Sequence, residues 1–457
     1  MSEMDQLEAA PNGFARPYVV SWNLTYRCNL ACEHCYLDAG FRPAVSSEAF
    51  ADRSELDTEQ CFRVVDQLVD FAPEALTILT GGEPLLRRDI LEIVRYAAER
   101  ELWVVVGTNG VKVTESLAGV LKEAGVRGLA LSLDALEPRV HDSFRRVRGA
   151  WRNTVEGAKI LARAGFPFIV QTTAGAHNRG ALEELAELAH AELGARVWNL
   201  YFLVPSGRGQ FVSDLSPADY DEVLAALRRI QRRYQGRMVV NAKCAPHSVR
   251  QLLEEDPSSP FFRSFTGGAG GCPAGTHYLG IRPNGDVTPC PYLPLFGGNL
   301  RSDRLVDVWN DSELFRTIRR RDQLGGRCGD CELSGYCGGC RARAHGMTGD
   351  LLGEDPLCTH RPGTFPLDRL PAAPALEYGR GETAVSSDGE DGGGSMVEWE
   401  PEAHERMKRI PAFVRGMVVS AVERRCREQG IARVTVAQLE EIRARMPTPK
   451  LFGRPPS

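Results

Sequence analysis

The chain has 457 residues, of which 43% are hydrophobic and 25% charged, as in a globular protein of two or three domains. Its net charge of −5 excludes a strongly basic surface, so we expect no nucleic-acid partner. No apolar run approaches the roughly 18 to 20 residues of a membrane span, and the polar N-terminus is unlike a signal peptide. We therefore expect no membrane association and a cytoplasmic location.

Apolar strand-like runs alternate with amphipathic helical segments from residue 18 to about residue 233. Six successive strand–helix units predict parallel strands with right-handed crossovers. A closed eight-unit barrel needs about 250 residues, so six units predict a partial, open (β/α)6 barrel with functional loops at the strands' carboxyl ends. The predicted strands are Tyr18–Leu24, Ala75–Thr80, Leu102–Gly107, Gly128–Leu133, Pro167–Thr173 and Val197–Val204. The predicted helices are Asp57–Phe71, Asp89–Arg100, Thr114–Ala124, Trp151–Ala164 and Ala181–Leu193.

Three cysteines, Cys28, Cys32 and Cys35, follow the first predicted strand with the spacing C-x3-C-x2-C. Three thiolates in so short a loop can hold three irons of a [4Fe–4S] cube and leave the fourth iron open, as reactive metal sites require. Zinc and reduced thiols are the alternatives, but structural zinc usually takes four ligands in two separated pairs. His34 lies between two of the cysteines, where the short loop limits its reach.

This spacing, with Gly81-Gly82-Glu83-Pro84 one unit later, resembles the radical S-adenosylmethionine (radical SAM) superfamily. The resemblance implies an open barrel and a 5′-deoxyadenosyl radical, formed from SAM at the cluster, that removes hydrogen from substrate carbon. It also implies that the glycine-rich segment meets the methionyl amine of SAM. For Ser132 and Asp134, at the end of the fourth strand, capping of the next helix is the alternative to a SAM contact. The other implied SAM contacts are Tyr36, Asn109, Ser132 and Asp134, with Gln171 and Thr173 in the same ring.

Arg145 lies in the acid- and base-rich segment His141–Arg146, which follows the fourth strand. Two interpretations stay open: a solvated helix start, or an arginine that holds a carboxylate of SAM or substrate, which guanidinium matches in a bidentate way.

Seven further cysteines lie between residues 272 and 358. They resemble the SPASM extension of radical SAM enzymes, which holds two auxiliary [4Fe–4S] clusters. The resemblance assigns Cys272, Cys290 and Cys340 to an inner cluster, with Cys244, or an open iron, completing it. A zinc ribbon is the alternative, but only five residues separate the paired cysteines. The outer cluster would take Cys328, Cys331, Cys337 and Cys358.

The central run ends in C-x2-C where the commonest form has C-x3-C, and Gly338-Gly339 fills that gap and would allow a tight turn. Cys61 and Cys426 stand alone in helical patterns and are predicted to be buried small apolar residues.

The tail begins with a proline-, glycine- and acid-rich stretch that predicts a disordered linker. Two helices, Pro401–Ile410 and Pro411–Glu428, follow, and Thr435 with Gln438 predicts a capping box for a third. This module resembles the C-terminal domain of the light-independent protochlorophyllide reductase B subunit, although a module for protein contacts is also possible. The expected divisions are an N-terminal tail at 1–17, the barrel at 18–235, the auxiliary domain at 236–365, the linker at 366–397 and the helical domain at 398–450.

Segments near Trp22, Phe202 and Arg341 resemble the tetrapyrrole-modifying branch of the superfamily. The resemblance implies decarboxylation, deacetylation or desaturation of a tetrapyrrole side chain in heme-type biosynthesis, with a reduced ferredoxin or flavodoxin as electron donor. Maturation of a ribosomally made peptide is the alternative enzyme function, and an electron carrier or scaffold the non-enzymatic one. Candidate substrate contacts are Arg145, Arg208, His247, His277 and Arg282.

Overall fold

The computed structural model describes residues 16–40, 53–212, 215–255, 271–370 and 397–408, and beyond these 418–419, 422–423, 425–426 and 429–445. Residues 371–396 of the predicted linker lie outside the described residues, as do most of the N-terminal tail and the start of the second tail helix.

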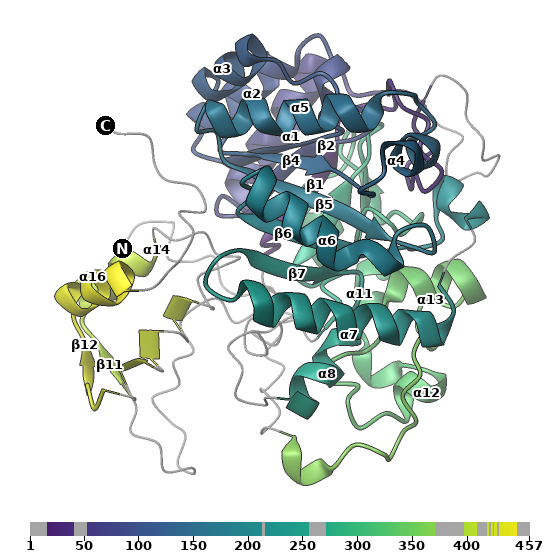
Figure 1. The fold of residues 1–457 in the computed structure, drawn as a ribbon, viewed down its shortest axis with the longest axis vertical. Coiled ribbons are helices and arrows are strands. Elements are labelled where there is room, and N and C mark those ends of the chain that lie inside the picture. Colours follow the sequence, from purple (N-terminus) through teal and green to yellow (C-terminus); the bar gives the residue numbers. More distant parts are fainter. Residues whose placement is uncertain are drawn as a thin grey trace.

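A ten-stranded sheet forms the centre of the molecule, in the order β10-β9-β8-β1-β2-β3-β4-β5-β6-β7 (Figure 1). Strands β8 and β1 to β7 run parallel, whereas β9 and β10 are antiparallel additions. The strands are β1 (Val19–Asn23), β2 (Leu76–Thr80), β3 (Trp103–Thr108), β4 (Leu129–Ser132), β5 (Phe168–Ala174), β6 (Val197–Phe202), β7 (Val239–Lys243), β8 (Tyr278–Ile281), β9 (Asp286–Thr288) and β10 (Gly298–Asn299).

The six predicted strands and their parallel order are confirmed, and the open barrel is longer than predicted at both edges. β7 continues the sheet beyond β6, and β8 pairs with β1 across more than 250 residues of sequence. Both come from residues assigned to the auxiliary domain, and β8 is followed directly by the antiparallel strand β9 and not by a helix.

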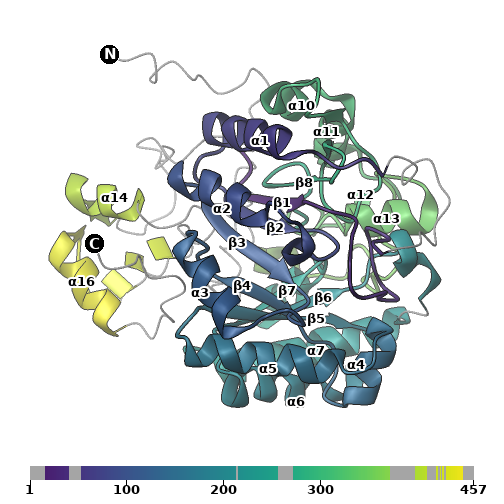
Figure 2. The same ribbon diagram turned by 90° about the horizontal axis from the view of Figure 1, so that it is seen from above.

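Helices surround the convex face of the sheet (Figure 2). Those of the barrel are α1 (Thr58–Phe71), α2 (Ile90–Glu99), α3 (Glu115–Glu123), α4 (Pro138–Arg145), α5 (Ala150–Arg163), α6 (Leu182–Glu187) and α7 (Pro217–Tyr234). α1 begins with the capping box of Asp57 and Gln60, and α7 with that of Ser216 and Asp219. The last predicted barrel helix divides into α6 and a π-helical turn, Leu188–Glu192.

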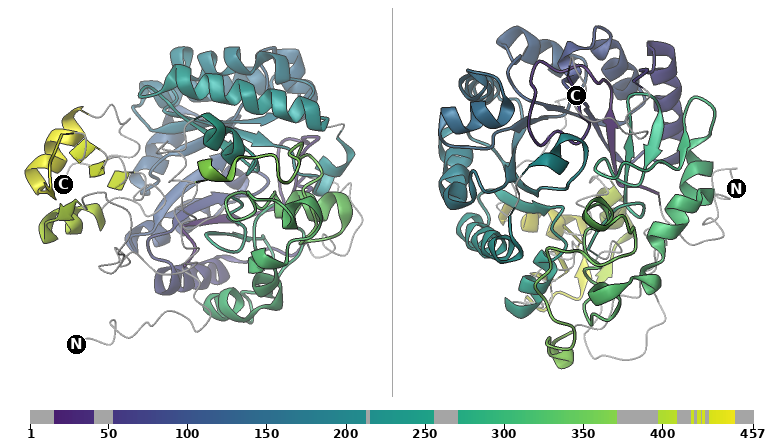
Figure 3. Two further views of the ribbon diagram at one scale, coloured as in Figure 1. Left: turned by 90° about the horizontal axis from the view of Figure 1, so that it is seen from below. Right: turned by 90° about the vertical axis from the view of Figure 1, so that its right-hand side faces the viewer.

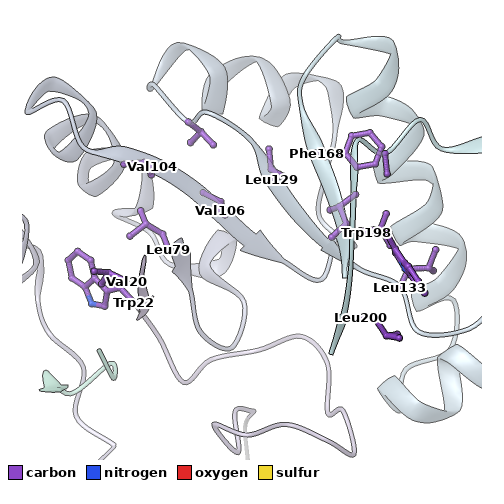
Figure 4. Close-up of a cluster of buried hydrophobic side chains, with 14 of the residues drawn as sticks. Val20, Trp22, Leu79, Val104, Val106, Leu129, Leu133, Phe168, Trp198 and Leu200 are labelled. Atoms are coloured by element: carbon purple, nitrogen blue, oxygen red, sulfur yellow. The ribbon is translucent and has the colours of Figure 1, made fainter. Parts of the chain in front are cut away.

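Side chains alternate between the two faces of each strand. Val20, Leu79, Val104 and Trp198 point outward into an apolar core shared with the helices, and each is fully buried (Figure 4). The intervening positions face the interior of the barrel and are more polar. This alternation creates a polar lumen inside an apolar shell.

The cysteine-rich region packs at one side of the barrel and contains α8 (Ser248–Glu255), α10 (Leu305–Asp311), α11 (Glu313–Arg319), α12 (Gly326–Gly329) and α13 (Arg341–Thr348) (Figure 3). The C-terminal part contains β11 (Glu398–Trp399), α14 (Pro401–Lys408), β12 (Arg433–Val434) and α16 (Val436–Arg445). The predicted capping box of α16 is confirmed by reciprocal bonds between Thr435 and Gln438. Cys61 and Cys426 are fully buried, as predicted. No described helix is long and apolar enough to cross a membrane.

Candidate functional site: a cavity between cysteine clusters

Cys28, Cys32 and Cys35 line one cavity at the carboxyl end of β1. Arg208 holds their loop, because its Nε donates to the Cys32 carbonyl and its backbone N–H to the Cys35 carbonyl, both at 2.9 Å. Gly207 lies against the same loop with φ 53°, and a Cβ there would come within 2.4 Å of the Cys35 carbonyl oxygen. The shape of the loop therefore depends on the segment after β6.

Gly81 and Gly82 also line this cavity, as predicted for a SAM contact. A Cβ on Gly82 would lie 2.2 Å from the Arg27 carbonyl oxygen, and one on Gly81 2.7 Å from that of Thr25. Glycine is required here because the segment after β2 packs directly on the backbone of the cysteine loop.

Glu83 and Pro84 do not line the cavity, and their place in the SAM-binding segment stays a prediction. The Glu83 carboxylate is fully buried and accepts hydrogen bonds from the Thr108 hydroxyl at 2.8 Å and the Asn109 N–H at 2.9 Å. Burial raises its pKa to about 7 despite these donors. Glu83 therefore connects the ends of β2 and β3.

The cavity wall opposite the cysteines comes from several strand ends, as predicted. The predicted residues that line it are Tyr36, Asn109, Ser132, Gln171 and Thr173. The Tyr36 hydroxyl donates to Asn23 at 2.7 Å, and Asn109 Nδ2 donates to Asn29 at 2.8 Å.

Asp134 is fully buried, does not line the cavity and does not cap α4, so its contact with SAM stays a prediction. Its carboxylate pairs with Arg145, which lowers the pKa of Asp134 and raises that of Arg145. Arg145 is buried, not solvated, and its Nη1 lies 3.5 Å from Cys32 Sγ. The arginine thus places a positive charge beside a thiol of the predicted cluster site.

Sequence reasoning missed three cavity tyrosines, Tyr201, Tyr278 and Tyr292. The Tyr292 ring lies 4.8 Å from that of Tyr36 and 6.4 Å from that of Tyr201, so these three rings form an aromatic wall. Tyr201 could have been found from the period of two along β6, whereas Tyr278 and Tyr292 carry no motif.

The inner cysteines meet behind this wall. Cys272, Cys290 and Cys340 belong to one buried cluster, and Cys244 packs against it in a left-handed backbone conformation with φ 59°. A hydrogen bond from the Cys340 thiol lowers the pKa of Cys272 and raises that of Cys340. Four sulfur donors in one apolar site fit an iron–sulfur cluster. Cys244 as the fourth ligand remains a proposal.

The outer cysteines Cys328, Cys331, Cys337 and Cys358 line a second cavity. Gly338 and Gly339 both have positive φ, and a Cβ on Gly339 would lie 3.1 Å from Cys328 Sγ. The tight turn that the short C-x2-C spacing requires is therefore present, and the four thiols fit a second cluster.

The remaining substrate candidates do not line the first cavity. His277 lies at the amino end of β8 with its ring 4.9 Å from Tyr18, and Arg282 is buried beyond the other end of that strand. His247 lines the second cavity, 3.3 Å from Asp355 and outside hydrogen-bond alignment. All three stay predictions, and the structure places each of them away from the first cavity.

Arg208 lines the first cavity, but its guanidinium donates to protein acceptors, including Asp38 and the Ala39 carbonyl, each at 2.8 Å. These bonds give Arg208 a structural role through Nε and Nη1, and its substrate contact stays a prediction.

Three parts of the chain match known protein families. Residues 22–189 match the radical SAM superfamily, residues 272–332 an iron-sulfur cluster-binding domain (SPASM), and residues 399–443 the proto-chlorophyllide reductase 57 kD subunit.

Relatives align over most of their length. The AdoMet-dependent heme synthase of Methanosarcina barkeri is 38% identical, over 76% of this chain and 97% of the relative. That of Nitratidesulfovibrio vulgaris is 35% identical, over 75% and 92%. The mycofactocin maturase MftC of Mycolicibacterium smegmatis is 33% identical, over 82% and 91%.

Among solved structures, Streptococcus suis SuiB bound to S-adenosylmethionine superposes with a TM-score of 0.60 at 18% identity, over 76% of this chain and 78% of that chain. For anSMEcpe with bound AdoMet the TM-score is 0.58 at 16% identity, over 75% and 94%. Both support the fold alone.

Proposed function

The chain belongs to the radical SAM superfamily, in the group with a SPASM-type cluster domain, and from this premise we propose that it decarboxylates a propionate side chain of a tetrapyrrole in heme-type biosynthesis. Cys28, Cys32 and Cys35 would hold the cluster that binds SAM, and the two further cysteine sites would hold auxiliary clusters. The cluster with SAM supplies a carbon radical that removes one hydrogen atom from the substrate.

The lining of the first cavity is the observation that carries the proposal. Among the described residues it contains tyrosines, amides and hydroxyls but no aspartate, glutamate or lysine. Its histidine, His34, is a weak base, because burial lowers its pKa to about 3. The lining therefore favours a reaction in which no proton must be taken from the substrate.

Propionate decarboxylation meets this condition. Once a hydrogen atom has left the carbon attached to the macrocycle, cleavage of the bond to the carboxylate gives a vinyl group, carbon dioxide and one electron. Desaturation of the same side chain would release a proton as well, for which the lining offers no strong acceptor. The names of the heme synthase relatives support a tetrapyrrole substrate.

The remaining electron needs an acceptor, and an oxidised iron–sulfur cluster held by the inner cysteines would serve. Cys290, a ligand proposed for the inner cluster, is followed directly by Pro291 and Tyr292, which line the cavity. Val204 touches both the inner cysteines and the cavity. One layer of side chains thus separates the inner cysteines from the cavity. A reduced ferredoxin or flavodoxin is the proposed external donor, and the cytoplasm the proposed location.

Peptide maturation is the second candidate, favoured by the 33% identity to mycofactocin maturase MftC. An anaerobic assay separates the two. Reconstituted protein with SAM and dithionite receives iron coproporphyrin, siroheme-derived tetrapyrroles, the peptide encoded nearby or no substrate, and mass spectrometry follows 5′-deoxyadenosine and substrate masses. We expect deoxyadenosine matched by carbon dioxide loss from a tetrapyrrole. Deoxyadenosine formed only with the peptide would overturn the tetrapyrrole proposal.

A further inference from the structure

A tetrapyrrole substrate carries several carboxylates, yet the cavity arginines are already engaged. Arg145 pairs with Asp134, and Arg208 pairs with Asp38 and bonds two backbone carbonyls. A substrate carboxylate at Arg145 would compete with its buried ion pair, and Nε and Nη1 of Arg208 already donate to protein acceptors. Substrate carboxylates that do not react therefore need a different cation.

Lys243, the last residue of β7, is such a cation. Its side chain has exposed surface, whereas its neighbours Ala242 and Val240 are buried against the helices; the protein packed around its ammonium group lowers the pKa of Lys243. Within the described ranges its side chain forms no ion pair or hydrogen bond. Its ammonium group is therefore available to a ligand.

The register of the sheet places Lys243 on the lumen side. Thr173 on β5 pairs with Tyr201 on β6, and Tyr201 pairs with Lys243 on β7. Residues paired in register across parallel strands point to the same face. Thr173 and Tyr201 both line the cavity. Lys243 therefore continues their row on β7, at the open edge of the cavity.

The aromatic wall joins this row to the cysteine loop. It runs from Tyr36 beside Cys35 to Tyr292 at 4.8 Å and then to Tyr201 at 6.4 Å, measured between ring centroids. Neighbouring strands lie about 4.8 Å apart, so Lys243 follows Tyr201 by one further step. The wall offers apolar area to a flat macrocycle, with the reacting end at the cysteines and a cation at the other end.

We infer that Lys243 binds a non-reacting carboxylate of the substrate at the end of the aromatic wall far from the cysteine loop. The inference rests on the proposed function. Lysine suits the position because its ammonium is a compact charge on a flexible stem, which can follow a carboxylate without a fixed bidentate geometry. Lys243 would thereby orient the macrocycle so that a different side chain reaches the SAM end of the cavity.

The test measures porphyrin binding to the reconstituted full-length enzyme by anaerobic absorbance titration. The probes are iron coproporphyrin III, with four carboxylates, and its tetramethyl ester, with none. For Lys243→Met we expect about tenfold weaker binding of the acid and unchanged binding of the ester, because a charged hydrogen bond is lost. Lys243→Arg should recover most of the affinity. Lys122→Met, which removes an exposed lysine from α3, is the matched control and should bind both probes as wild type does.

Three results would overturn the inference. Equal affinity of wild type and Lys243→Met for the acid would exclude the contact, while the decarboxylation assay on the same preparation could still support the proposed function. A loss of affinity for acid and ester alike, with reduced iron content, would indicate a structural role. Failure of wild type to bind or convert any tetrapyrrole would reject the proposed function and the inference with it.

Discussion

Two buried arginine–aspartate pairs support different regions of the molecule. Arg145 pairs with Asp134 beside the cavity, and Arg343 pairs with Asp355 at 2.9 Å in the cysteine-rich region. In each pair the residues lie close in sequence, and each arginine lowers the pKa of its aspartate.

Their surroundings separate their roles. Arg145 reaches the thiol of Cys32, so its charge acts on one iron ligand. Arg343 donates to the Cys244 carbonyl at 2.7 Å and the Leu203 carbonyl at 3.4 Å, while Asp355 accepts from the Cys340 N–H at 2.8 Å. The Arg145–Asp134 pair thus sets the local charge beside Cys32. The Arg343–Asp355 pair joins the barrel to the inner cysteine site.

The largest expected effect is that of Arg343→Met, which leaves Asp355 buried without its partner. Breaking a buried pair costs roughly 4–5 kcal/mol of unfolding free energy. Denaturant unfolding measures this loss, and the double variant Arg343→Met/Asp355→Asn should recover part of it. Unchanged stability of the single variant would show that the pair does not join the two regions.

Arg145→Met should cost somewhat less, roughly 3–4 kcal/mol, because Arg343 also donates to two buried backbone carbonyls, those of Cys244 and Leu203. Unlike the first variant, it should also change the EPR signal of the SAM-bound cluster, since a positive charge beside Cys32 is lost. Arg146→Met is the matched control, because the Arg146–Glu33 pair is exposed and should contribute under about 1 kcal/mol. An unaltered EPR signal in Arg145→Met would show that the charge of Arg145 does not affect the cluster, so that the two pairs would not differ in this respect.

Glu83 extends the comparison, because its buried carboxylate forms no ion pair with an arginine among the described residues. Its folded pKa of about 7 exceeds the unfolded value, so the folded state binds more protons between about pH 4.5 and 7. This group therefore makes stability fall as pH rises through that window, by up to about 3 kcal/mol. Glu83→Gln should flatten the pH dependence of the unfolding free energy there.

Asp134 and Asp355 have the opposite sign. Their pKa values are lowered, so their contribution is present above the unfolded pKa of about 3.9 and is lost as pH falls further. If the unfolding free energy of Glu83→Gln still falls between pH 5 and 7, that fall does not arise from Glu83.

The smallest expected effect is that of His247→Leu. The His247 ring lies near Asp355 without hydrogen-bond alignment, so its removal should cost only about 1 kcal/mol. Thermal unfolding compared with Arg343→Met measures the difference. A loss as large as that of Arg343→Met would mean that the histidine, not the arginine, compensates the Asp355 charge.

Local patterns predicted the barrel strands to within about two residues, as for Val197–Val204 against the observed Val197–Phe202. They also predicted the cysteine loop, because short spacing fixes which thiols can share a cluster. By contrast, Asp134 and Glu83 were assigned to SAM from their motifs, and the structure turns both carboxylates toward partners inside the protein.

The sequence by itself determined the class of chemistry, since three thiols within eight residues and a glycine-rich segment one unit later are local facts. Only the tertiary structure decided what surrounds the cavity. Tyr278 faces Ser21 in the lumen because β8 pairs with β1, and Lys243 joins the row of Tyr201 because β7 pairs with β6. Such pairings join distant segments through burial and backbone hydrogen bonds, and no local periodicity encodes them.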